Sequence, residues 1–89
     1  MLAMDGKAQV SGKTCDVGAS GVSVNLADPL TAGQGGQIAF DLMVDGSVVT
    51  INTRVKVSHC IFSSGEFKVG FQFITPDLAA VTALARFTR

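Results

Sequence analysis

The chain has 89 residues, of which 47% are hydrophobic and 16% are charged. This length predicts one domain, because it leaves no room for a second core, and the apolar content excludes intrinsic disorder. Seven basic residues balance seven acidic ones, so the charges predict no broad positive field. We therefore expect neither nucleic acid polymers nor membrane surfaces as partners. The apolar runs are too short for a membrane helix, and no direct membrane insertion is expected.

The first third of the chain predicts three strands. Asp5-Gly6 follows a short apolar segment and is a strong short-range signal for a tight hairpin turn. Residues 8–17 are predicted as the returning strand. From Val22 to Leu26 apolar and polar residues alternate, which is typical of a strand with one buried face.

The middle of the chain predicts a loop and then a second hairpin. Residues 27–37 contain proline and several glycines without the spacing of a phosphate-binding loop. Alternating apolar and polar residues flank Asp45-Gly46 on both sides, which predicts two paired antiparallel strands with one wet face. Arg54 and Lys56 fall on that wet face, where charged side chains are ordinarily only solvated.

The end of the chain predicts one more strand and a helix. Phe67, Val69, Phe71 and Phe73 alternate with polar residues or glycine. The period then changes to that of a helix, for which Thr75 is predicted as the N-cap residue and Pro76 as the first helical residue. The apolar stripe that we expect to face the core consists of Leu78, Val81, Leu84 and Phe87.

These elements predict an all-β fold, a six-stranded antiparallel β-barrel with one C-terminal α-helix, because strands and helices do not alternate. No residue pattern predicts catalysis. His59, the only histidine, has no partners at metal-ligand spacing, and Cys15 and Cys60 are expected to be reduced, buried thiols. We therefore expect no enzyme, no metal and no cofactor.

The segment Asp16–Gly21 joins two predicted strands and allows two interpretations. Its glycines permit a turn with positive φ or the close approach of a ligand, and its aspartate can cap local amides or accept hydrogen bonds from a base edge. On the residues alone, a structural turn stabilised by the aspartate is favoured over a binding site.

The order of these elements resembles the PilZ domain, a bacterial receptor module for the second messenger cyclic di-GMP. The resemblance rests on Asp-x-x-x-x-Gly at Asp16 and Gly21, and on Val-Gly-Phe-Gln-Phe at 69–73 before a terminal helix. It covers residues 1–89 as a single PilZ-like domain. It implies that Asp16 hydrogen-bonds a guanine edge and that Gly21 allows close backbone approach. The implied ligand-binding residues are Asp16, Gly18, Ser20 and Gly21.

Two departures from the family pattern concern this site. Gly18 stands where the family motif has serine, which removes a hydroxyl contact. The family also has two arginines spaced four apart upstream of the aspartate, whereas only Lys7 and Lys13 precede Asp16 here and the first arginine is Arg54. Lysine lacks the planar fork that binds phosphate and guanine at two points. Either the arginine motif lies upstream in a longer parent, or this is a divergent PilZ domain without nucleotide binding.

The resemblance implies a regulatory domain that controls an attached or partner protein, and the two reduced cysteines predict that it is cytoplasmic. The tail at 84–89 also resembles the end of the PilZ domain in bacterial cellulose synthase catalytic subunits. That likeness implies cellulose biosynthesis as the regulated process, a glycosyltransferase in the parent chain, and a place at the cytoplasmic face of the inner membrane. The alternative is a degenerate PilZ barrel that acts as a protein-interaction module.

Overall fold

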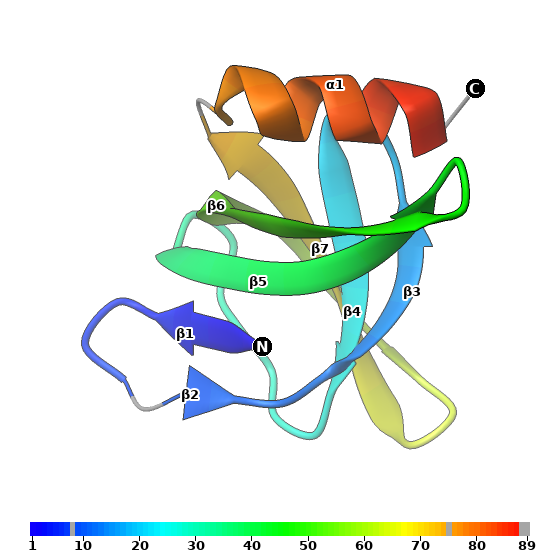
Figure 1. Cartoon of the computed structure of the whole chain (residues 1–89). Helices are drawn as coiled ribbons and strands as arrows, with labels where there is room; N and C mark the ends of the chain where they lie inside the picture. Colours follow the sequence, from blue (N-terminus) through cyan, green and yellow to red (C-terminus); the bar gives the residue numbers. More distant parts are fainter. Residues whose placement is uncertain (8, 75, 88–89) are drawn as a thin grey trace.

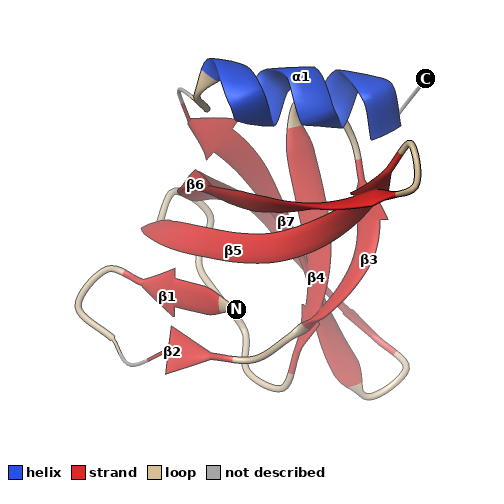
Figure 2. Cartoon of the chain, in the orientation of Figure 1, coloured by secondary structure: helices blue, strands red, loops and turns tan. Residues whose placement is uncertain are grey.

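The computed structural model describes residues 1–7, 9–74 and 76–87, which form seven strands and one helix (Figure 1). The strands are β1 (Leu2–Met4), β2 (Gln9–Val10), β3 (Lys13–Val17), β4 (Gly21–Leu26), β5 (Gly35–Val44), β6 (Ser47–Ser63) and β7 (Glu66–Ile74), and the helix is α1 (Leu78–Phe87). All strands belong to one antiparallel sheet with the order β2-β1-β5-β6-β7-β4-β3. The helix lies across one end of the bent sheet (Figure 2).

The predicted mostly β, antiparallel fold with a C-terminal helix is confirmed, but the sheet has seven strands rather than six. The predicted strand over 8–17 divides at Ser11-Gly12. Its first part pairs with β1 at one edge of the sheet, and its second part pairs with β4 at the other edge. The chain itself therefore connects the two edges, and no hydrogen-bonded closure of a barrel is detected among the described residues.

Gly12 explains why the strand divides there. A Cβ atom at this position would lie 2.7 Å from Cδ2 of Leu26 and would also strike Cγ1 of Val24. Glycine permits this close approach to β4, whereas a larger residue would have to displace these two methyl groups. The break thus has a steric cause that strand periodicity does not reveal.

Strand β6 is shared by two parts of the sheet. Residues 47–56 pair with β5, and residues 54–63 pair with β7. The register of the β6–β7 pair shifts between Val57 and His59, and that of the β3–β4 pair shifts between Thr14 and Asp16. Bulges of this kind bend a strand and increase its twist, so the sheet curls around its inner face.

The core fills the inside of this curl. Alternate residues of the strands point inward, as the period of two predicts, and the rings of Phe40 and Phe73 stack with centroids 6.2 Å apart. Thr53 is a buried polar residue on β6, and its hydroxyl donates to the carbonyl of Arg54. The buried cluster consists of Leu2, Met4, Val22, Val24, Leu26, Ile38, Leu42, Val44, Ile51, Val55, Val57, Val69, Phe71, Phe73, Ala80, Ala83 and Leu84.

The Asp45-Gly46 turn is confirmed as a two-residue hairpin, with φ angles of 50° and 81°. The Asp5-Gly6 turn is also present, since Lys7 N donates to Met4 O at 3.0 Å, but Ala3 pairs with Gln9, so the loop of this hairpin is longer than the two residues predicted. A further hairpin turn at Ser64-Gly65 joins β6 to β7 with φ angles of 52° and 82°. Positive φ at both central positions matches the twist of the flanking strands, so this turn is of the same type as the one at Asp45-Gly46. The sequence analysis did not predict it.

The helix packs through a face that differs from the predicted stripe. Ala80, Ala83 and Leu84 are buried, whereas Leu78 and Phe87 are exposed. Steps of three residues fall about 60° short of one helical turn, so residues 78 and 87 lie on opposite sides of the helix. The inward face therefore contains only one member of the predicted stripe, Leu84.

The N-cap of α1 is Asp77, because its Oδ1 accepts a hydrogen bond of 2.8 Å from the backbone N–H of Ala80. The predicted first helical residue, Pro76, precedes that cap, and the predicted cap, Thr75, lies outside the described residues. None of the helices in the described ranges is long and apolar enough to cross a membrane.

Arg54 is not merely solvated, because it forms a two-point ion pair with Asp5. Nη1 and Nη2 donate to the carboxylate at 2.9 and 2.7 Å, which ties β6 to the turn after β1. The hydrogen bond from Arg54 lowers the pKa of Asp5 and the same bond raises the pKa of Arg54. Because folding lowers the pKa of Asp5, this pair stabilises the fold at pH values above the ordinary pKa of aspartate. The stabilisation is lost as the pH falls through the lowered pKa.

We predict that Asp5→Asn destabilises the protein at pH 7 and that this loss disappears as the pH falls through the lowered pKa of Asp5. Urea unfolding over a series of pH values measures the difference. In an Arg54→Gln background the substitution should make no difference at pH 7, since the partner charge is gone. An equal loss in both backgrounds would contradict the assignment of the effect to this pair.

Candidate functional site

The turn between β3 and β4 brings all four predicted ligand-binding residues to one groove. Gly18 N donates to Gly21 O at 2.9 Å, which closes the turn, and Ser20 O accepts from Phe73 N at 2.9 Å, which fixes the turn against β7. Asp16 lies near the end of β3 and Gly21 begins β4. The groove has a volume of about 280 Å³ and is lined by Asp16, Gly18, Ser20, Gly21, Val22, Ser23, Ser58, His59, Gly70 and Phe71.

The strand register explains how the groove extends beyond the turn. Asp16 pairs with Ser23, Ser23 with Gly70, and Gly70 with His59, which makes one row across four strands. The residues beside this row on β4 and β7, including Val22, point into the core. The row therefore lies on the outer face of the sheet. Three strand spacings separate its ends, about 14 Å.

Two bulges frame this row. The β3 bulge contains Cys15 and directly precedes Asp16, and the β6 bulge contains Ser58 and directly precedes His59. Bulges next to binding sites commonly re-aim a side chain. The two ends of the row are thus set by irregularities in the strands.

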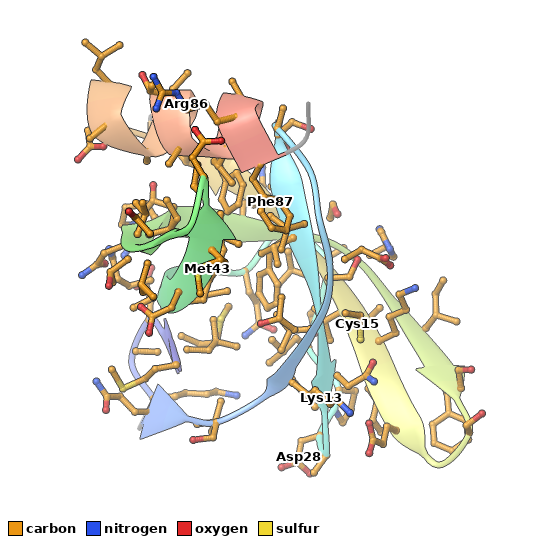
Figure 3. All side chains as sticks on the ribbon, turned by 45° about the vertical axis from the view of Figure 1, so that its right-hand side comes forward. Lys13, Cys15, Asp28, Met43, Arg86 and Phe87 are labelled. Atoms are coloured by element: carbon orange, nitrogen blue, oxygen red, sulfur yellow. The ribbon has the colours of Figure 1, made fainter. Side chains whose placement is uncertain are left out.

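The first bulge also corrects the expectation that both cysteines are buried. Cys15 is exposed, and its side chain projects from β3 away from the interior, like that of Lys13 (Figure 3). The register shift removes Cys15 from the regular pairing with β4. Cys60 is half-buried and packs against the core, as expected for the inward position beside Val69.

The carboxylate of Asp16 forms an ion pair with Nζ of Lys68 at 3.2 Å. The two side chains are 74% and 41% exposed, so the pair contributes little to stability. Asp16 can therefore exchange this contact for hydrogen bonds to a ligand at small cost. Lys68 also places one positive charge beside the groove.

The glycines of the turn differ in what surrounds them. A Cβ atom at Gly21 would strike the carbonyl oxygen of Phe71, which is backbone on the paired strand and cannot move aside. At Gly18 the nearest atom is the carbonyl oxygen of Gly21, at 3.8 Å. Gly21 is therefore required by the fold, whereas position 18 has space for a serine side chain.

His59 lies at the far end of the groove, where the sequence interpretation did not place a binding residue. Its ring lies over Gly70, since a Cβ atom at position 70 would fall among the ring atoms. Ser58 Oγ lies 3.2 Å from Nδ1 of the ring and donates to Gly70 O at 3.1 Å. The place of His59 in the groove follows from the pairing of β6 with the Val-Gly-Phe segment of β7. A single histidine in the sequence gives no indication of that pairing.

The part of the chain that the structure describes contains no group of three or more histidine, cysteine, aspartate or glutamate side chains that could hold a metal ion. The groove offers instead a carboxylate, hydroxyl groups, an imidazole and exposed backbone. Such groups suit hydrogen bonding to a polar organic ligand.

Comparison with protein families identifies a PilZ domain over residues 2–89. No curated protein and no solved structure matches the chain. PilZ domains are non-catalytic and are typically receptors for cyclic di-GMP. Because the match spans nearly the whole chain and the strands and terminal helix have the expected order, the chain belongs to the PilZ domain family.

Proposed function

We propose that this chain is a cyclic di-GMP-binding regulatory domain whose groove between β3 and β6 holds a guanine base. The observation that carries the proposal is that Asp16, Gly18, Ser20 and Gly21 all line the same groove. The Watson–Crick edge of guanine carries two adjacent N–H groups, which a carboxylate can accept together. Asp16 is the carboxylate that lines this groove.

The size of the groove supports binding of part of the dinucleotide. Its volume of about 280 Å³ lies just below the usual range of ligand pockets, roughly 300–1,000 Å³. One base fits this space, while the phosphates need cationic groups from outside it. Lys68 supplies one such charge, and the two-arginine motif of the family would supply the others where a parent chain carries it.

Regulation would follow from a shift in population. A ligand that contacts both this groove and a flanking segment favours the arrangement in which the two are close, and so repositions an attached domain or partner protein. The likeness of the tail at 84–89 supports control of cellulose synthesis by an attached glycosyltransferase, in the cytoplasm at the inner membrane.

Titration calorimetry with cyclic di-GMP tests the proposal. We expect Asp16→Ala, which removes the acceptor, to weaken binding at least tenfold, because hydrogen bonds to a charged acceptor contribute about 1.5–3 kcal/mol. Asp41→Ala is the matched control, since Asp41 is an exposed aspartate of β5 that bonds Thr50 and does not line the groove. Equal affinities of the two variants and the unchanged protein would contradict the role of Asp16.

A second prediction concerns Gly18. Because position 18 has room for a side chain, Gly18→Ser should restore the hydroxyl contact of the family motif and strengthen cyclic di-GMP binding about threefold to tenfold. The same calorimetric titration measures the gain. Weaker binding by this variant would show that the hydroxyl does not reach the ligand.

The alternative function is a protein-interaction module. It is favoured by the absence of arginine before Arg54 and by exposed apolar side chains of α1, including Leu78 and Val81. A groove of about 580 Å³ lies between α1 and the β5–β6 hairpin, with Val44, Val49 and Ala83 among its lining residues. Absence of cyclic di-GMP binding by both the unchanged protein and Gly18→Ser would favour this alternative.

A further inference from the structure

The groove has a second end, which the family motif does not include. His59 comes from β6, three strands away from Asp16, yet both side chains line the same groove. Between them the row contains only Ser23 and Gly70. The imidazole of His59 lies over Gly70, so the floor that remains open between Asp16 and the imidazole is formed by the small side chain of Ser23.

Gly70 determines where the imidazole lies. A Cβ atom at position 70 would lie 2.7 Å from both ring nitrogens and closer still to Cε1. The ring therefore occupies the space that any other residue at position 70 would fill. This keeps the imidazole low on the sheet, at the level of a ligand lying on Ser23.

Ser58 engages one of the two ring nitrogens. Its Oγ lies 3.2 Å from Nδ1 and is held in turn by the carbonyl of Gly70 at 3.1 Å. Among the described side chains, none hydrogen-bonds Nε2 of His59. A histidine whose Nδ1 is engaged in this way has Nε2 available for a ligand.

We propose that His59 is a ligand-contacting residue that closes the far end of the guanine groove. This inference rests on the proposed function. When Asp16 accepts from the Watson–Crick edge, the opposite edge of guanine, with its N7 and O6 acceptors, points along the row towards β6. In the tautomer with its proton on Nε2, the Ser58 hydroxyl turns from Gly70 O to donate to Nδ1, and Nε2–H of His59 donates to that edge. The base is then held at both edges by residues of two non-adjacent strands.

Calorimetric titration with cyclic di-GMP tests this contact with variants that separate the imidazole from the fold. We expect His59→Ala to weaken binding about fivefold to tenfold, and His59→Gln to recover part of the loss because its amide also donates. Gly70→Ala keeps the imidazole but moves it aside, and should weaken binding similarly. Asn52→Ala, an exposed position of β6 outside the groove, is the control. Thermal unfolding verifies that each variant is folded.

The imidazole supplies a second readout. Because His59 is the only histidine, its ring proton signals in an NMR spectrum are unambiguous, and they should shift on saturation with cyclic di-GMP. GMP should shift them in the same direction, and cyclic di-AMP should not, since adenine lacks the O6 acceptor and the Watson–Crick pattern that suits Asp16.

The outcomes distinguish the inference from the proposed function. If Asp16→Ala weakens binding while the His59 and Gly70 variants bind normally and the imidazole signals stay unmoved, the inference is wrong and the proposed function stands. If the unchanged protein does not bind cyclic di-GMP, both are wrong.

Discussion

Replacing Gly21 by alanine is expected to lower the free energy of unfolding by about 3 kcal/mol, at the upper end of the cost of overpacking. The added Cβ atom would strike the carbonyl oxygen of Phe71, and the next atoms, Phe71 C and Gln72 Cα, are also backbone. The β4–β7 register from Gly21 to Leu26 holds this carbonyl in place. Relief therefore requires separation of two paired strands. Urea denaturation measures the loss.

Gly18→Ala is the matched control for this prediction. It makes the same chemical change three residues earlier in the same turn, where the nearest atom to the new Cβ would be 3.8 Å away. Its free energy of unfolding should stay within about 0.5 kcal/mol of the unchanged protein. Similar losses for the two variants would show that general turn flexibility, rather than the contact with Phe71, makes glycine necessary at position 21.

The second large effect is expected for Leu84→Ala, which should cost about 3 kcal/mol. Leu84 is 1% exposed and belongs to the buried cluster through which α1 packs against the sheet. Shortening it removes buried methyl groups and leaves a cavity at the end of the core. Thermal or urea unfolding gives the change in stability.

Leu78→Ala, on the same helix, provides the comparison. Leu78 is 81% exposed, so the same substitution should change the free energy of unfolding by no more than about 0.5 kcal/mol. The periodicity of the sequence alone would assign both leucines to the core. Comparable losses for the two variants would therefore contradict the helix face observed here.

How much of the fold the sequence predicts depends on the kind of interaction involved. The inward faces of the strands were predicted because burial follows a period of two, and Val22, Ile51 and Phe71 are indeed buried. The division of the strand at Gly12 was not predicted, since its cause is contact with β4, a strand that follows later in the chain. Local periodicity contains no information about such a crossing.

The same distinction applies to the candidate site. Asp16 and Gly21 were identified only through the family motif, because a turn with aspartate and glycine has an ordinary structural explanation. His59 could not be connected with them, since the connection depends on a register that runs across β3, β4, β7 and β6. The bulge at Ser58, which sets the position of His59, also has no sequence pattern of its own.

The most direct test of the central claim is a map of backbone amide shifts, from ¹H–¹⁵N NMR spectra recorded during titration with cyclic di-GMP. The account predicts that the amides of Gly18, Gly21 and Gly70 shift, while those of Ala79 and Thr82, in the groove beside α1, do not. Shifts confined to the α1 groove, or no shifts at all, would contradict binding of the dinucleotide between β3 and β6.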